Sequence, residues 1–124
     1  MKGAGQMYQS KLQDAQIDAL FEAMQCLETK EDYYRFFEDI STVAEIKALA
    51  QRMEVARMLD QEQTYTEIVK ITGASTATIS RVKRCLNYGA DGYRLVLDRM
   101  KEKSEQKQIL VTLAGPAINF FISS

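Results

Sequence analysis

The chain has 124 residues, 46% of them hydrophobic, which is enough for one domain with a core and short for two. It contains no His, the commonest general base and metal ligand, and no nucleophile–base pair or phosphate-binding glycine loop, so we expect neither an enzyme nor a metal site. Cys26 and Cys85 lack a CxxC spacing, and no charged segment followed by an apolar one opens the chain, which predicts a cytoplasmic protein with reduced thiols.

The formal net charge of −1 conceals an uneven distribution of charge along the chain. Residues 1–62 carry 7 Lys and Arg against 12 Asp and Glu, residues 63–103 carry 8 against 4, and residues 104–124 carry one of each. A nucleic acid responds to the local electric field, so its phosphates are expected against the basic segment 63–103. The alternative is that this asymmetry arises by chance in a short chain.

The first third of the sequence predicts a leader and two helices. Residues 1–9 show no apolar period and are expected to be flexible. Apolar residues then recur at helical spacing between Leu12 and Leu27, which predicts an amphipathic helix. Residues 31–40, EDYYRFFEDI, crowd aromatic side chains between acids. Because the acids would repel phosphate, we expect this second helix to be buried in the core or at a dimer interface rather than to stack bases.

The middle of the sequence predicts a central helix. Thr42, followed three residues later by Glu45, forms a capping-box pattern, and the helix is expected to run to about Leu59. Its apolar face is broad enough to contact two neighbouring helices. The polar residues 60–63 end it. Further on, residues 87–93 have the composition of a turn, after which Asp91 is expected to cap a sixth helix that runs through Met100.

The C-terminal segment, residues 104–124, differs in composition because it contains ILVTLAGPAINFFI, an apolar run of 14 residues. This run is split by Gly115 and Pro116 and is too short to span a bilayer, so we expect no membrane partner. Packing against a protein surface is favoured over lipid contact or disorder, and the role of the tail is left open. The folded domain is therefore expected to cover residues 10–103.

The stretch TYTEIVKITGASTATISRVKRCL, residues 64–86, predicts a helix-turn-helix. Two short helices that cross steeply need a turn residue that tolerates positive φ, and Gly73 supplies it. They also need apolar residues that hold the helices together, here Ile68 and Val69 before the turn, with Ile79 and Val82 after it.

The exposed face of the second helix in this motif carries side chains suited to DNA. Short Thr, Ser and Ala side chains can approach base edges in the major groove, while Arg and Lys suit phosphates or guanine. The structural alternative is a capped helix pair whose polar outer face has no DNA role. We expect base contacts from Thr76, Ala77 and Ser80, backbone contacts from Thr66, Lys83 and Arg84, and further contacts from Ser75, Thr78 and Arg81.

From about Thr42 to Tyr93 the sequence resembles the Trp-repressor-like family, and GASTATISRVKRCLNYG is similar to its small YerC/YecD branch. The resemblance implies an all-α fold of six helices with a helix-turn-helix. It also implies an intertwined homodimer, in which the first three helices and the last interlock between subunits and two reading heads lie about one DNA turn apart.

The resemblance further implies an effector pocket. In tryptophan-responsive members two arginines sandwich the indole ring, and Arg52 and Arg81 stand at the matching positions, with Thr42 and Thr78 at further pocket positions. An arginine pair that faces across a gap suits an aromatic amino acid such as L-tryptophan.

Two positions depart from this pocket pattern. Val82 stands where the tryptophan-responsive members have glycine, and its branched side chain would project toward the indole space. Cys85 replaces an expected polar residue. These differences argue against tryptophan sensing, and they leave Arg52 to pair with an acid and Arg81 to contact phosphates.

The sequence therefore predicts a sequence-specific DNA-binding transcriptional regulator without a cofactor, a repressor that occupies double-stranded operator DNA as a homodimer. The alternative from another class is a protein-interaction module. Such a protein would keep the helix-turn-helix shape and use its acidic, aromatic N-terminal half to bind a partner protein.

Overall fold

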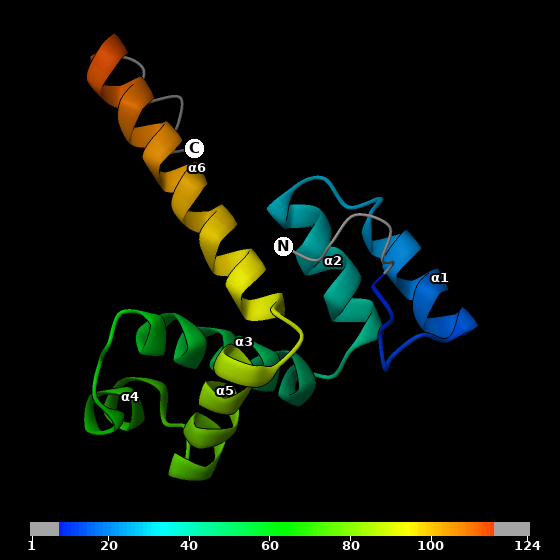
Figure 1. Ribbon diagram of the computed structural model, residues 1–124. Helices are drawn as coiled ribbons and strands as arrows, with labels where there is room; N and C mark the ends of the chain where they lie inside the picture. Colours follow the sequence, from blue (N-terminus) through cyan, green and yellow to red (C-terminus); the bar gives the residue numbers. More distant parts are fainter. Residues whose placement is uncertain (1–7, 116–124) are drawn as a thin grey trace. The chain divides into compact units, whose positions relative to one another are not determined.

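The structure, a computed structural model, describes residues 8–115, and within them it contains six α-helices and no strand (Figure 1). This confirms the predicted all-α fold. The chain divides into two compact units, residues 1–46 and 47–124. The leader predicted for residues 1–9 lies mostly outside the described residues, as does the end of the apolar tail. The helices are α1 (Ala15–Met24), α2 (Lys30–Ile40), α3 (Val43–Asp60), α4 (Tyr65–Thr72), α5 (Thr76–Tyr88) and α6 (Gly92–Ala114).

Each helix of the first unit begins at a side chain that accepts hydrogen bonds from free backbone N–H groups of the first turn. Asp14 caps α1, and Thr29 and Asp32 form a reciprocal capping box at the start of α2. The backbone N–H of Glu28, followed by that of Thr29, donates to the Asp32 carboxylate and lowers its pKa. Thr42 caps α3, its Oγ1 accepting from the backbone three residues on at 3.1 Å. Local polar chemistry therefore sets where these helices start.

The first unit has no buried core. No described residue before Val55 is buried. The rings of Phe36 and Phe37 meet edge to face, with centroids 5.5 Å apart, yet both side chains are only half-buried, and Tyr34 is 65% exposed. Burial of residues 31–40 in a core of the single chain is therefore a wrong prediction, because the short helices of this unit bring too few apolar side chains together to cover the aromatics.

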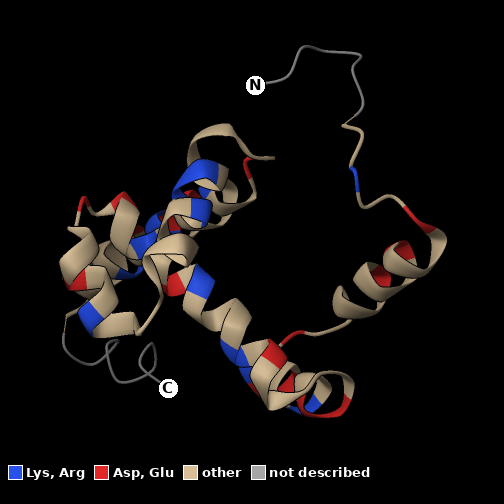
Figure 2. Ribbon diagram, turned by 90° about the horizontal axis from the view of Figure 1, so that it is seen from below, with Lys and Arg blue, Asp and Glu red and all other residues tan. Residues whose placement is uncertain are grey.

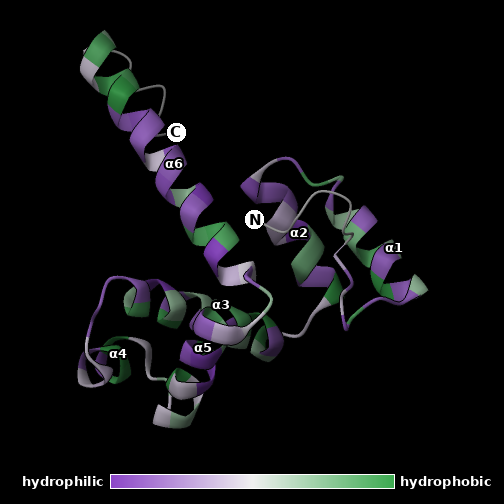
Figure 3. Ribbon diagram, in the orientation of Figure 1, coloured by the Kyte–Doolittle hydropathy of each residue, from purple (hydrophilic) through white to green (hydrophobic). Residues whose placement is uncertain are grey.

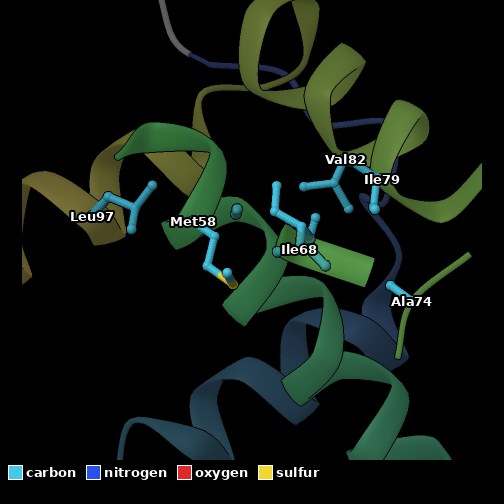
Figure 4. Close-up of a cluster of buried hydrophobic side chains, with 8 residues drawn as sticks. Met58, Ile68, Ala74, Ile79, Val82 and Leu97 are labelled. Atoms are coloured by element: carbon cyan, nitrogen blue, oxygen red, sulfur yellow. The ribbon is translucent and has the colours of Figure 1, made fainter. Parts of the chain in front are cut away.

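The second unit contains the hydrophobic core. Ile68 of α4 points toward Ile79 and Val82 of α5, and Met58 of α3 lies between this helix pair and Leu97 of α6 (Figure 4). Burying one such side chain contributes roughly 1.5–3 kcal/mol. This contact set therefore fixes α5 against α4. The buried residues are Val55, Ala56, Met58, Ile68, Ala74, Ile79, Val82 and Leu97.

A charged network joins the end of α3 to α6. Oδ1 of Asp60 accepts from Nη1 of Arg94, and Oδ2 accepts from Nζ of Lys101, both at 2.8 Å. The Asp60 side chain is 11% exposed. The bonds from Lys101 and then Arg94 favour its charged form and lower its pKa. Two cations from α6 thus hold one carboxylate at the last residue of α3.

The start and the end of α6 differ from the sequence prediction. Asp91 stands at the N-cap position of α6 as expected, but its backbone is left-handed, with φ 65°, and its side chain makes no capping hydrogen bond. The helix also does not end near Met100. It continues to Ala114, where the backbone N–H of Gly115 still donates to the carbonyl of Val111.

The last turns of α6 carry the first part of the apolar run. Figure 3 shows the hydrophilic middle of the helix giving way to a hydrophobic end, where Ile109, Leu110 and Leu113 are exposed. Within residues 8–115, no helix combines the length and the apolar character needed to cross a membrane. The expectation that this run packs against a protein surface stays a prediction.

Replacing Asp60 by Asn should lower the free energy of unfolding by about 1–2 kcal/mol at neutral pH, because an amide cannot form the two ionic bonds. The folded pKa of Asp60 lies below its ordinary value of 3.8, so this stabilisation is present above 3.8 and is lost as the pH falls through the folded pKa. In urea unfolding experiments at decreasing pH, the difference in unfolding free energy between wild type and Asp60→Asn should become smaller in acid. Asp98→Asn is the control, since Asp98 meets Arg94 only at 3.6 Å and is 53% exposed. If the difference in unfolding free energy between wild type and Asp60→Asn did not change with pH, the ionic origin of the stabilisation would be contradicted.

Candidate nucleic-acid interface

The turn between α4 and α5 is three residues long and has the geometry that the sequence predicts. α4 ends at Gly73, whose backbone is left-handed, with φ 71° and ψ 6°, and whose N–H donates to the carbonyl of Val69. A residue with a β-carbon would cost about 1–2 kcal/mol in this conformation. Ala74 then lies buried against the core, and Ser75 begins α5.

Side-chain hydrogen bonds fix this turn. Oγ1 of Thr72 donates to the carbonyl of Ile68 at 2.7 Å and accepts from the N–H of Ala74 at 3.1 Å. From α3, Nε2 of Gln51 donates to the carbonyl of Thr72 at 3.1 Å. The turn is therefore bound both to the helix before it and to α3, which holds α5 in one orientation relative to the rest of the unit.

Two of the predicted DNA-binding hydroxyls take part in capping α5. Oγ of Ser75 accepts from the backbone N–H of Thr78 at 3.1 Å and also donates to Oγ1 of Thr78 at 3.1 Å. Ser75 is exposed, while Thr78 is half-buried. The structure therefore gives both side chains a local role at the start of the helix.

The remaining predicted DNA-binding residues form an open face. Among the described residues of α5, the charged ones are all basic, whereas those of α1 are all acidic (Figure 2). A helix turns by 100° per residue, so residues 76, 80, 83 and 87 follow one stripe along the flank of α5, while residues 77, 81 and 84 lie on the side away from Ile79 and Val82. Besides Ser75, the exposed members of the predicted set are Thr66, Thr76, Ala77, Ser80, Arg81, Lys83 and Arg84.

One contact at this face was not predicted from the sequence. The Nζ atom of Lys83 lies 5.7 Å from the centroid of the Tyr65 ring, within the range of a cation–π interaction. Tyr65 is the first residue of α4, and its ring is half-buried against the core. Sequence reasoning missed Tyr65 because the two residues lie on different helices and become neighbours only once the turn is made.

The residues expected to form an effector pocket belong to both compact units. Arg52 and Arg81 are both exposed, and both act on Tyr93. Burial raises the pKa of the Tyr93 hydroxyl, Cys85 raises it further, and the two guanidinium groups oppose the rise. The two arginines therefore share one neighbourhood around Tyr93. Thr42 belongs to the other compact unit, where it caps α3.

The Val82 side chain is packed in the core. It is 2% exposed and faces Ile68 across the α4–α5 contact (Figure 4). The structure therefore accounts for its branched side chain as part of the packing that holds the two helices together.

Other reactive side chains form no further site in the part of the chain that the structure describes. Both cysteines, Cys26 and Cys85, are free and exposed. Within residues 8–115, no group of three or more Cys, Asp or Glu side chains is placed to hold a metal ion.

Comparison with known proteins gives a consistent set of matches. The family described as Trp repressor protein matches residues 15–101. A curated Bacillus subtilis (strain 168) protein, named uncharacterized protein YerC, is 58% identical over 92 residues, which are 74% of this chain and 88% of that protein.

Two solved structures resemble this one in fold and sequence. A crystal structure of a Staphylococcus aureus protein, described as a candidate Trp repressor, matches with a TM-score of 0.70 at 53% identity over 73% of this chain and 91% of that one. A TrpR-like protein from Eubacterium eligens ATCC 27750 matches with a TM-score of 0.71 at 50% identity, over 73% of this chain and 94% of the other. These proteins share the helical fold with this chain over most of their length.

Replacing Gly73 by Ala should lower the free energy of unfolding by about 1–2 kcal/mol, because the added β-carbon disfavours the left-handed backbone. The cost arises in the backbone alone, since no atom lies within 4 Å of the position of that carbon. Gly92→Ala is the matched control. It also meets open space, but it lies in the first turn of α6, where Ala is favoured over Gly. Denaturant unfolding of both variants measures the difference, and equal stability of the two would contradict the role of Gly73.

Proposed function

The chain belongs to the Trp repressor family, in its YerC branch, and from this premise we propose that it is a sequence-specific transcriptional regulator that represses by occupying operator DNA as a homodimer in the cytoplasm. The family and the fold are those of DNA-binding regulators rather than enzymes. One observation carries the proposal: the polar face of α5 is open, and it follows a tight turn fixed by Gly73.

Each part of the open face suits a distinct part of a DNA duplex. Thr76, Ala77 and Ser80 are short enough to let α5 enter the major groove, where Thr and Ser hydroxyls bond base edges and methyl groups meet thymine. Arg84 and Thr66 suit the phosphates on either side of that groove. The roles follow from the side chains and from their exposure on neighbouring helices.

The N-terminal unit supports the dimer part of the proposal. A chain segment that buries none of its aromatic side chains does not gain enough from the hydrophobic effect to offset the entropy of ordering its backbone. We expect a second copy of the chain to supply the missing burial. A dimer would also provide a second reading helix, so that two half-sites could be bound at once.

A groove within the N-terminal unit is a suitable place for that second copy. It encloses about 450 Å³ beside α2 and the start of α3. Tyr34, Val43 and the other apolar side chains make its surface largely hydrophobic, as expected for an interface that stays covered. Its lining consists of Lys30, Tyr33, Tyr34, Phe37, Glu38, Ser41, Thr42, Val43 and Ile46.

The proposed regulator binds its operator without tryptophan. Support comes from Cys85, which stands where tryptophan-responsive members have a polar residue. Val82 replaces their glycine, but its side chain packs against Ile68 in the core, so the expectation that it projects toward an indole space is wrong.

The alternative function is a protein-interaction module, and the exposed aromatic groove of the N-terminal unit is the observation that favours it. A gel shift against random duplex at low salt distinguishes the two functions. A DNA-binding regulator keeps weak affinity for any duplex because its cations displace counterions from the phosphates.

Selection of bound sequences from a random DNA pool should yield a two-fold symmetric operator, equally with and without L-tryptophan. Thr76→Val should then relax the preference at one base pair per half-site by about 1–3 kcal/mol, since the methyl groups remain and the hydroxyl is lost. Arg84→Ala is the comparison variant and should weaken binding to operator and random duplex alike. Recovery of no consensus would refute sequence-specific binding, and recovery only with tryptophan would refute the effector-independent mode.

Light scattering should give twice the mass of one chain for the wild type, and Tyr34→Glu should shift the protein toward a monomer by placing a charge in the proposed interface. Ile71→Glu is the control, because Ile71 on α4 is equally exposed, at 65%, but lies outside the groove. A wild-type monomer, or a Tyr34→Glu protein that remains fully dimeric, would contradict an interface at this groove.

A further inference from the structure

The contact between Lys83 and Tyr65 joins a long, exposed side chain to a ring that is packed against the core. Tyr65 begins α4, and its ring packs against the core of the second unit. Lys83 is exposed on α5, with its ammonium nitrogen 5.7 Å from the ring centroid. A lysine has four rotatable side-chain bonds, so an exposed one normally samples many positions. The ring face restricts these positions to the neighbourhood of the α4–α5 junction.

The ring holds the ammonium group without neutralising its charge. Among residues 8–115, the ion pairs involve Arg35, Arg57, Arg94 and Lys101, and none involves Lys83. Glu62 and Asp60 line the same hollow as Lys83. The Asp60 carboxylate, however, is already bonded by two cations from α6. Because no carboxylate forms an ion pair with Lys83, its positive charge is not neutralised within the described part of the chain.

This charge lies at the edge of the proposed DNA-reading face. Lys83 follows Thr76 and Ser80 along the same stripe of α5. Tyr65 is followed directly by Thr66, which is exposed on α4 and is expected to meet the DNA backbone. The ring therefore places the ammonium group between the base-reading stripe and the backbone-contacting start of α4.

We propose that Tyr65 is a positioning residue for DNA binding, whose ring face holds the Lys83 ammonium group where it meets a DNA phosphate. The inference rests on the proposed function. Phosphate is the expected ligand because it is the anion that borders the major groove on both strands. Tyr65 acts by limiting the conformational freedom that Lys83 would otherwise lose on binding, so it contributes to affinity without contacting DNA itself.

A double-mutant cycle on a random duplex across a salt series tests this proposal. Lys83→Ala should weaken binding and reduce the slope of log K against log salt by about one. Tyr65→Leu should weaken binding by about two- to five-fold, whereas Tyr65→Phe should match the wild type because it keeps the ring face. In the Lys83→Ala background, Tyr65→Leu should have no further effect.

Arg84 provides the matched control for this cycle. It is adjacent in sequence, basic and exposed, and no ring contact joins it to Tyr65. The effects of Arg84→Ala and Tyr65→Leu should therefore add. Because Tyr65 packs against the core, each variant is first checked for a cooperative thermal transition, and Tyr65→Met replaces Tyr65→Leu if the latter does not fold.

A measurement on the free protein separates this proposal from the proposed function. The ε-methylene protons of Lys83 should resonate upfield of those of other lysines because of the Tyr65 ring current, and the shift should persist in Tyr65→Phe and vanish in Tyr65→Leu. An unshifted wild-type resonance, or additive effects of Tyr65→Leu and Lys83→Ala, would overturn the positioning role while leaving DNA binding intact. A wild type that binds no duplex even at low salt would overturn both.

Discussion

The packing of Ile68 against Ile79 and Val82 is the contact on which the rest of the structure depends. It holds α5 across α4, and the left-handed backbone of Gly73 provides the sharp turn between the two helices that this packing needs. Once these apolar faces meet, helical periodicity places Ala77, Ser80 and Arg84 on the opposite, open side of α5, with Thr76 on its flank. The same packing that stabilises the second unit therefore orients its candidate DNA-binding face.

Hydrogen bonds and ion pairs add to the hydrophobic contact by fixing the ends of α3 and α4 relative to neighbouring helices. Gln51 ties the carbonyl at the end of α4 to α3, and Asp60 draws two cations of α6 to the last residue of α3. These bonds lie at the periphery of the core, where one partner is partly exposed and each contributes modestly. Their importance is geometric, because they restrict how the helices around α5 can shift when a large anionic ligand approaches.

The two compact units differ in how they achieve stability. Residues 47–115 bury a set of aliphatic side chains, whereas residues 8–46 cap their helices well but leave Tyr34 and other large side chains exposed. Capping fixes where helices begin and does little to hold them to one another. The apolar side chains that the N-terminal unit leaves exposed are those that the proposed second copy of the chain would cover.

The sequence alone determined the six helices, the glycine turn and the composition of the candidate DNA-binding face, because helical period, capping residues and positive φ are local properties of a few neighbouring residues. It misjudged the side-chain capping by Asp91, the end of α6 and the burial of α2 in a core of the single chain, because these depend on contacts or backbone conformations that neighbouring residues do not reveal. Only the tertiary structure placed the Tyr65 ring beside the Lys83 ammonium group and brought Arg52 and Arg81 close enough to Tyr93 to oppose the rise in its pKa. Such neighbours come from different helices, and they meet only after packing has fixed the angle at which those helices cross.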